Sequence, residues 1–313
     1  MSIYSEQDQS EILRESVNQL SESDSFGNVC HKHQIGEPMP SVVKMEIFVT
    51  KVREILFPGY FGNTTLDPIA IKYYMGVYVD EVFDLLSEQI LAGLCFACTD
   101  KLDLETKLVV NTQKARILAA EFIAYLPTLR RLLSYDVEAT YIGDPAALGR
   151  GEIIFCYPAI RAISSYRIAH KLVELGVPLI PRIITEMAHS ETGIDINPEA
   201  KIGEYFTIDH GTGTVIGATC IIGNNVKLYQ GVTLGAKSFA LDEKGNPIKG
   251  VPRHPIIEDN VIIYAQATIL GRITIGKGSI IGGNVWVTND LPPNSKVVQF
   301  KVRNASFNDG GGI

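Results

Sequence analysis

Two histidines in the last third of the chain are the first candidates for chemistry. His210 lies in the segment Asp209-His-Gly-Thr-Gly213, and His254 lies in Arg253-His-Pro255. An imidazole titrates near neutral pH, so such a side chain can take up and return a proton during a reaction. The alternative interpretations are a polar turn residue at position 210 and an exposed loop residue at position 254. The pattern of the surrounding sequence favours a functional role for both.

Aliphatic residues recur at every sixth position in this part of the chain. Many of these units hold a second small or apolar residue two positions earlier, as Val226 precedes Leu228, which indicates a short strand with alternate residues pointing inward. Glycine often follows and permits a turn. A fixed period of strand and turn predicts a solenoid, in which three units close one triangular coil and stacked coils pair in parallel. An ordinary sheet domain would not keep such positions in phase. The three runs are Ile196, Ile202 and Ile208; Ile216, Ile222, Leu228 and Leu234; and Ile257, Ile263, Ile269, Ile275, Ile281 and Val287.

The repeat is interrupted twice, and each histidine lies at an interruption. Ile208 and Ile216 are eight positions apart instead of six, and the extra residues fall around His210. Between Leu234 and Ile257 the chain leaves the repeat in a loop that contains His254. A loop of about twenty residues inside a compact repeat is uncommon unless it has a function. We therefore expect the functional site at these two interruptions.

The rest of the chain divides by composition, so we expect an α+β protein with its helices and strands in separate domains. Residues 1–40 are rich in Ser, Glu, Asp and Gln, which predicts a largely disordered arm with room for one short helix. Residues 41–190 show the apolar spacing of an α-helical domain. Residues 191–290 form the predicted solenoid, with the extruded loop at 235–256. Residues 291–313 are a polar tail.

Start and stop signals outline the helices. A first helical pattern ends at Pro58, and Asp67-Pro68 starts a second. A third pattern covers residues 104–133, with a kink or break expected at Pro127. Asp144-Pro145 is a further start signal, and a final helix is expected from Tyr157-Pro158 to the Gly176 region.

Bulk composition excludes several classes of function. The net charge of −7 argues against binding to nucleic acid or to an anionic membrane. The first residues lack the features of a secretory signal, and the apolar stretch 90–98 is too short to span a bilayer. Five cysteines at irregular spacings do not indicate a disulfide framework. We expect a cytoplasmic protein.

Six motifs, in order and at compatible spacings, resemble those of serine O-acetyltransferases in the hexapeptide-repeat acyltransferase superfamily. The resemblance is strong over residues 140–290 and is limited to the general design before residue 140. It implies a left-handed parallel β-helix, and a homotrimer or dimer of trimers (a hexamer) with its sites between subunits. The motifs are Asp144-Pro-Ala146, Ser165-Tyr-Arg-Ile-Ala-His170, Asp195-Ile-Asn-Pro-Glu-Ala-Lys-Ile-Gly203, Ile208-Asp-His-Gly-Thr-Gly213, Val232-Thr-Leu-Gly235 and Arg253-His-Pro255.

The resemblance implies direct transfer of an acetyl group from acetyl-CoA to L-serine, the first step of cysteine biosynthesis, without a metal. His210 would be the general base and Asp195 its orienting partner. Asp144 and Asp209 would hold the serine ammonium, with a plain helix cap as the alternative role for Asp144. Arg253 and His254 would hold the serine carboxylate.

Two further roles follow from the same resemblance. Backbone groups near Gly235, Ala236 and Ala265 would contact CoA, although family members often have Gly-Gly where this chain has Gly235-Ala236. The tail Asp309-Gly-Gly-Gly-Ile313 is similar to tails that dock in the active site of O-acetylserine sulfhydrylase (cysteine synthase). L-Cysteine is expected to inhibit by occupying the serine site.

Three alternatives remain at the level of sequence. A hexapeptide acetyltransferase could act on O-phosphoserine, a sugar or an antibiotic. A metalloenzyme of the same fold, like the γ-type carbonic anhydrases, would need three histidine ligands for zinc, whereas the repeat holds only His210 and His254. A non-enzymatic scaffold could use its tail to regulate a partner.

Overall fold

The structure is a computed structural model that describes residues 6–31, 35–62, 67, 70–98 and 103–299. The chain divides into two compact units, Met1–Glu37 and Pro38–Ile313. The first unit contains α1 (Glu6–Ser21) and the short α2 (Ser23–Phe26). Helix α1 is longer than the composition suggested, because its apolar side chains recur at the spacing of one helix face. These exposed side chains are Ile12, Leu13, Val17 and Leu20.

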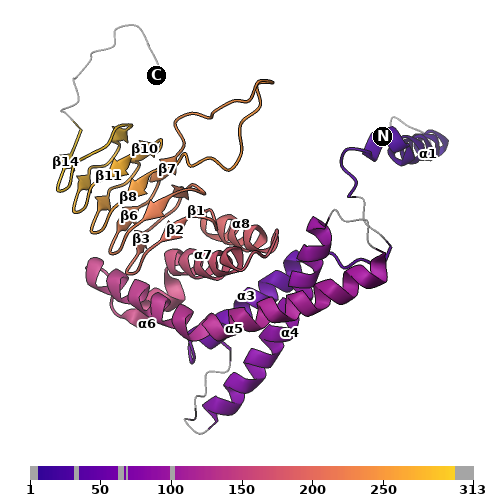
Figure 1. The fold of residues 1–313 in the computed structure, drawn as a ribbon, viewed down its shortest axis with the longest axis horizontal. Helices are drawn as coiled ribbons and strands as arrows, with labels where there is room; N and C mark the ends of the chain where they lie inside the picture. The colour runs from indigo at the N-terminus through magenta and orange to yellow at the C-terminus, as the bar shows by residue number, and fades with distance from the viewer. Residues whose placement is uncertain (1–5, 32–34, 63–66, 68–69, 99–102, 300–313) are drawn as a thin grey trace. The chain divides into compact units, whose positions relative to one another are not determined.

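The second unit begins with a helical domain, as predicted (Figure 1). Its helices are α3 (Val42–Leu56), α4 (Ile71–Ala97), α5 (Leu104–Gly143), α6 (Arg150–Cys156), α7 (Pro158–Glu174) and α8 (Ile180–Thr192). Side chains satisfy the first free N–H groups of two of them. The Ser41 hydroxyl accepts from the Lys44 amide at the start of α3, and the Asp103 carboxylate accepts from the Thr106 amide at the start of α5.

Two expectations about these helices were wrong, and of the kink or break expected at Pro127 only the break is contradicted. Pro127 does not break α5, because Leu126, Leu129 and Leu133 stay buried on one face and their packing outweighs the lost backbone hydrogen bond. Since α5 continues to Gly143, Asp144 ends a helix instead of starting one.

The helix that ends near Gly176 is not the final one. Helix α8 follows it, and Pro181 is tolerated there because it lies in the first turn. Ile180, Ile184 and Ala188 lie four residues apart and are buried, which gives α8 its packed face.

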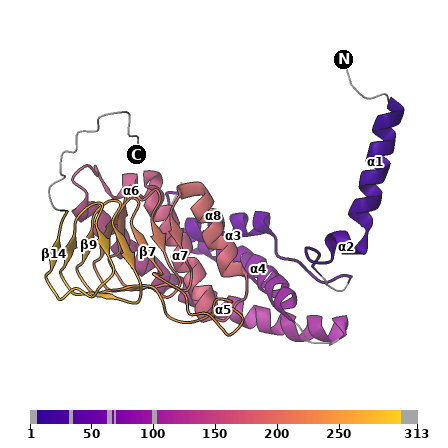
Figure 2. The same ribbon diagram turned by 90° about the horizontal axis from the view of Figure 1, so that it is seen from above.

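The C-terminal part is a parallel β-solenoid of five turns, as predicted (Figures 1 and 2). One face has the strand order β1-β4-β7-β10-β13, the second β11-β8-β5-β2, and the third β14-β12-β9-β6-β3. Successive coils are therefore β1–β3, β4–β6, β7–β9 and β10–β12, with β13 and β14 in the last turn. The strands are β1 (Asp195–Ile196), β2 (Lys201–Ile202), β3 (Thr207–Asp209), β4 (Val215–Ile216), β5 (Ile221–Ile222), β6 (Lys227–Tyr229), β7 (Thr233–Gly235), β8 (Ile256–Ile257), β9 (Ile262–Ile263), β10 (Thr268–Leu270), β11 (Thr274–Ile275), β12 (Ile280–Ile281), β13 (Trp286–Val287) and β14 (Lys296–Val297).

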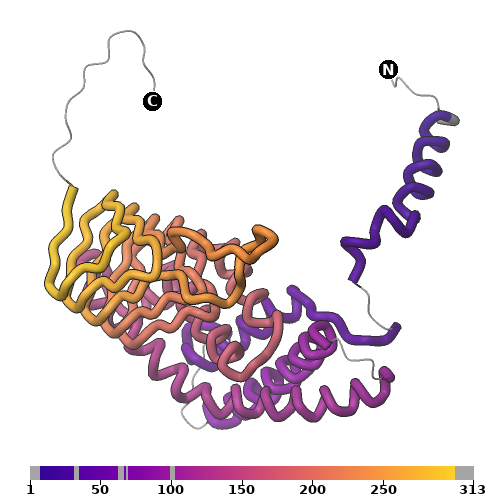
Figure 3. Tube along the Cα trace, turned by 45° about the horizontal axis from the view of Figure 1, so that its top comes forward, coloured from indigo at the N-terminus to yellow at the C-terminus, as the bar shows by residue number. Residues whose placement is uncertain are grey.

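The register between strands confirms the six-residue period. Ile216 pairs with Ile196 on one side and with Leu234 on the other, and Ile269 pairs with Leu234 and Val287. All five side chains are buried, so each recurring aliphatic position contributes to one continuous apolar column. The loop between β7 and β8 projects from this stack (Figure 3).

The helical domain packs against the first coil. Helices α5 and α7 contact β3, and α7 and α8 contact β1. The Tyr166 hydroxyl on α7 donates to the Ala200 carbonyl at 2.6 Å. This contact holds the helices at the end of the solenoid that contains Asp209 and His210. None of the helices in the described part of the chain is long and apolar enough to cross a membrane.

Candidate active site

The turn after β3 presents His210 to solvent. Residues 210–214 connect β3 to β4, whereas residues 230–232 connect β6 to β7, so the first turn is longer by two residues. His210 has a φ of 57°, in the left-handed region that costs a non-glycine residue about 1 kcal/mol. The following Gly211 has a φ of 93°, and a Cβ there would lie 2.5 Å from Ile194. The His210 side chain is 76% exposed. The interruption of the repeat therefore directs an imidazole outward.

 His210 lines a cavity with a volume of about 680 Å³. A separate cavity of about 810 Å³ lies between α3 and α8. The 680 Å³ cavity lies where the end of α5, the start of α7 and the strands β3 and β6 meet. Three predicted site residues line it together, Asp144, Asp209 and His210.

Hydrogen bonds fix the carboxylate of Asp144 at the end of α5. Its Oδ2 accepts the Tyr157 hydroxyl at 2.6 Å, and its Oδ1 accepts the Ala146 amide at 2.8 Å. The Tyr157 bond and then the Ala146 bond lower the pKa of Asp144. The same bond raises the pKa of Tyr157 to about 12. Asp144 is therefore ionised at neutral pH and offers a negative charge to the cavity.

A second carboxylate, Asp209, lies between two nitrogen groups. Its Oδ1 is 3.7 Å from His210 Nε2, and its Oδ2 is 3.3 Å from the Nζ of Lys227. Lys227 was not among the site residues predicted from the sequence, because a lysine on the outward side of a repeat is common. Its signal lies in the strand register, because Lys227 pairs with Thr207, two residues before Asp209.

Arg253 and His254 lie at a different corner of the solenoid, just before β8. His254 is 7% exposed, and its Nδ1 accepts the Thr219 amide at 3.1 Å and the Thr219 hydroxyl at 2.8 Å. A Cβ on Gly217 would lie 2.0 Å from this ring, so only glycine leaves room for it. Burial, and then the charges of Arg253 and Arg272, lower the pKa of His254. The ring is therefore neutral with its proton on Nε2, where it can donate a hydrogen bond.

Asp195 lies at the start of β1, beside α8. Its carboxylate, Glu186 and His189 offer ligand atoms that all lie within 4.8 Å of one another, and these are the residues in the described ranges that could hold a metal ion together. In the part of the chain that the structure describes, no hydrogen bond joins Asp195 to His210. The expected pairing of base and partner is therefore not formed in this structure, although β1 pairs with β4, the strand that follows the His210 turn.

The positions expected to contact CoA are separated in one chain. Gly235 ends β7 and pairs with Leu270 at the end of β10, and Ala236 follows it. Ala265 lies in the turn before β10, at the opposite end of the same face. Ile313, the expected contact for the sulfhydrylase, lies outside the described residues.

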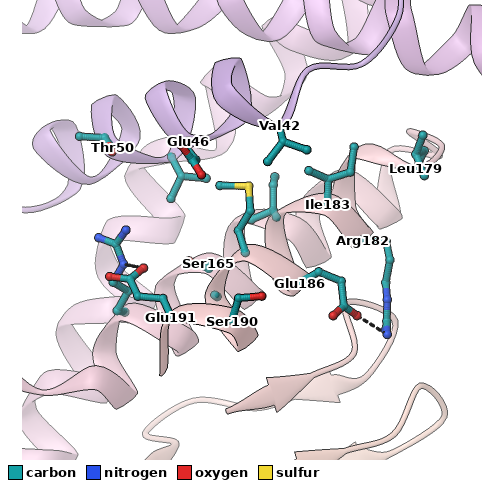
Figure 4. Close-up of a pocket in the computed structure, with 15 residues that line it drawn as sticks. Val42, Glu46, Thr50, Ser165, Leu179, Arg182, Ile183, Glu186, Ser190 and Glu191 are labelled. Atoms are coloured by element: carbon teal, nitrogen blue, oxygen red, sulfur yellow. Dashed lines mark hydrogen bonds and ion pairs between the residues drawn. The ribbon is translucent and has the colours of Figure 1, made fainter. Parts of the chain in front are cut away.

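The larger cavity lies between α3 and α8 (Figure 4). Val42, Ile183 and Leu179 give it an apolar side, and Arg182 pairs with Glu186 on its rim. Asp144, Asp209 and His210 do not line it. Size alone therefore does not mark the site, and the smaller cavity has the better set of groups for acid–base chemistry.

The fold and the cavity define a class, the hexapeptide-repeat transferases with a helical domain. The family described as bacterial transferase hexapeptide (six repeats) matches residues 254–289. The Synechococcus elongatus protein named "Serine acetyltransferase, plasmid" is 50% identical to this chain over 276 residues. The matched residues cover 88% of this chain and 86% of that protein. The chain belongs to the serine acetyltransferases.

Solved structures show the same likeness over nearly the whole chain. The crystal structure of Entamoeba histolytica serine acetyltransferase 1 in complex with L-cysteine is 33% identical, with a TM-score of 0.69, and covers 92% of this chain and 96% of that one. A soybean serine acetyltransferase complexed with serine is 27% identical, with a TM-score of 0.52, and covers 84% and 96%.

Proposed function

We propose that His210 is the general base in the transfer of an acetyl group from acetyl-CoA to L-serine, which yields O-acetyl-L-serine and CoA. The observation that carries this proposal is the lengthened turn after β3, which directs the His210 imidazole into a cavity lined by Asp144 and Asp209. The reaction is the one that defines the serine acetyltransferases. The assignment of roles to residues is our inference.

The chemistry needs a base because a serine hydroxyl is a weak nucleophile. As the hydroxyl oxygen attacks the thioester carbonyl, neutral His210 takes its proton. The tetrahedral intermediate then collapses, the carbon–sulfur bond breaks, and the imidazolium returns the proton to the CoA thiolate. Asp209, 3.7 Å from Nε2, stabilises the imidazolium between these steps. No acyl-enzyme is required, since the acceptor is itself the alcohol.

We infer that the acceptor is held at both of its charged ends. Asp144 and Asp209 attract the ammonium group from within one chain. Arg253 and His254 suit the carboxylate, because His254 presents Nε2–H and the arginine is a natural carboxylate partner. Since they lie at another corner, they would complete the site from a neighbouring subunit of a trimer. Asp195 begins β1, which pairs with β4 directly after the His210 turn, so Asp195 would orient His210 from within the same chain.

L-Cysteine has the same ammonium and carboxylate groups as L-serine and differs only in its thiol. The likeness to the Entamoeba histolytica enzyme in complex with L-cysteine supports binding of cysteine in the serine site here. We therefore propose competitive inhibition by L-cysteine. Association with O-acetylserine sulfhydrylase through Ile313 remains a prediction, tested by deleting Ile313 and measuring both binding and transfer.

The test of the base is the variant His210→Ala, assayed by initial rates with L-serine and acetyl-CoA. Loss of a general base lowers kcat by about 10²- to 10⁴-fold. Activity within a few-fold of the wild type would refute the role of His210. Faster turnover of O-phosphoserine or of a sugar than of L-serine would instead refute the acceptor.

A further inference from the structure

Lys227 is the one lysine or arginine among the described residues that line the cavity. Its Nζ donates to the Gly143 carbonyl at 2.8 Å and lies 3.3 Å from Asp209 Oδ2. The same group lies 4.7 Å from the centre of the Tyr229 ring. Only 17% of the side chain is exposed. Its place in the cavity is therefore fixed by three separate contacts.

The contacts of Lys227 join two elements that carry the carboxylates. Gly143 is the last residue of α5, and its carbonyl is among those that a helix leaves without a backbone partner. A lysine is a favourable partner there, because the C-terminus of a helix carries partial negative charge. Asp144 follows directly, and Asp209 ends the neighbouring strand β3. One ammonium group thus sets where α5 ends relative to Asp209.

Lys227 also sets the charge of the cavity. Burial alone would lower the pKa of Lys227, but its contacts with Tyr229 and Asp209 outweigh burial and raise that pKa, so the side chain stays charged. Two carboxylates and one ammonium leave a net charge of −1 with His210 neutral. This charge matches an acceptor with one ammonium group.

We propose that Lys227 is a positioning residue for the amino group of the acceptor. It holds Asp144 and Asp209 at a fixed separation, so that both carboxylates face one ammonium group. This inference rests on the proposed assignment of Asp144 and Asp209 as the ammonium site. It extends that assignment to a residue whose side chain meets the acceptor only through them.

A simpler electrostatic role makes the opposite prediction. If Lys227 only adds positive charge to the cavity, its removal strengthens the attraction for an ammonium group and lowers the KM for L-serine. If Lys227 positions the carboxylates, its removal lets Asp209 and the end of α5 move apart and raises that KM. The sign of the change in KM therefore separates the two roles.

The experiment compares Lys227→Met with Lys227→Arg, measuring kcat and both KM values. Loss of a charge-assisted hydrogen bond predicts a rise of about tenfold in the KM for L-serine, while the KM for acetyl-CoA stays within about twofold. Lys227→Arg should restore the KM for L-serine to within about threefold, because a guanidinium can reach the same two oxygens. A KM for L-serine that is unchanged or lowered would overturn the proposal. So would a parallel rise of both KM values with a lower Tm.

A matched control is Lys277→Met, which removes another solenoid lysine that lies near an aspartate, Asp259, at 4.0 Å. Lys277 does not line the cavity, so both KM values should equal those of the wild type. Equal effects of Lys227→Met and Lys277→Met would point to a general loss of charge and overturn the proposal.

The variant Asp209→Asn separates failure of this inference from failure of the proposed ammonium site. If Asp209→Asn leaves the KM for L-serine unchanged, the ammonium site is wrong and the role of Lys227 is lost with it. If Asp209→Asn raises this KM and Lys227→Met does not, only the role of Lys227 is wrong. When both raise it, the double variant should match Asp209→Asn within about twofold, since loss of the Asp209 charge already breaks the link that Lys227 makes between Asp209 and the end of α5.

Discussion

At the scale of single residues, His254 shows how neighbours set the state of an imidazole. Thr219 donates two hydrogen bonds to its Nδ1, and a protonated ring could not accept them. The pKa of His254 is lowered by burial and by the nearby arginines. The unfolded chain therefore binds the proton more readily than the folded one. It follows that His254 contributes stability above the ordinary histidine pKa of about 6.5, and that this stability is lost as the pH falls through the folded-state pKa.

The variant His254→Asn tests this linkage, because an amide oxygen can accept from Thr219 without titrating. We expect the wild type to lose more Tm than His254→Asn when the pH is lowered from about 7 to about 5. Thermal unfolding followed by circular dichroism at each pH measures the difference. Equal losses of Tm in the two proteins would show that His254 does not titrate between the folded and unfolded states in this range.

Residue-level prediction succeeded where a residue type coincided with a break in the repeat. The phase shift before Ile216 predicted a longer turn around His210, and that turn is present directly after Asp209, the last residue of β3. Lys227 could not be found in this way, because its place beside Asp209 depends on the register of two coils and on where α5 ends. Both are facts of tertiary packing, which a single sequence does not state.

At the scale of elements, a buried ion pair joins α5 and α7 to the first coil. Asp136 is fully buried and accepts two hydrogen bonds from Arg167, at 2.6 and 2.8 Å. Its Oδ1 also accepts the Phe206 amide, and Arg167 donates to the Gly203 carbonyl. Asp136 lies about two helical turns before Asp144. The pair thus holds together the elements that carry the two sides of the cavity.

Removing one partner of this pair should destabilise the fold strongly. Asp136→Asn leaves the Arg167 charge buried without its counter-charge, which costs about 3–5 kcal/mol. The exposed pair of Arg116 and Asp84, 3.7 Å apart, is the matched control, and Asp84→Asn should cost less than about 1 kcal/mol. Chemical denaturation measures both free energies of unfolding. Similar losses in the two variants would contradict a structural role for the buried pair.

The elements differed in how far the sequence predicted them. The solenoid followed from spacing alone, because each aliphatic position must point inward and a shift of one residue would expose it. The helices were less certain, since a local signal such as Pro127 or Asp144-Pro145 competes with packing. The burial of Leu129 and Leu133 decided that α5 continues through its proline. Such burial is a property of the folded helices and is not visible in one sequence window.

At the scale of the whole molecule, one chain holds two incomplete halves of the proposed site. His210, Asp144 and Asp209 line one cavity, while Arg253 and His254 lie at another corner of the solenoid. In a closed trimer each His210 half would face the Arg253 half of the next chain. Each complete active site would then lie at an interface between two chains.

Mixing two inactive variants tests this arrangement. His210→Ala lacks one half of the site and Arg253→Ala lacks the other, so a mixed trimer contains some interfaces with both halves intact. Random assembly of equal amounts restores about a quarter of the wild-type activity, since each intact half comes from one of two chains. Mixing His210→Ala with Asp209→Ala is the matched control, because these residues share one half and no interface is restored. If the first mixture is as inactive as the control, His210 and Arg253 of one site come from the same chain, and the site does not lie between subunits.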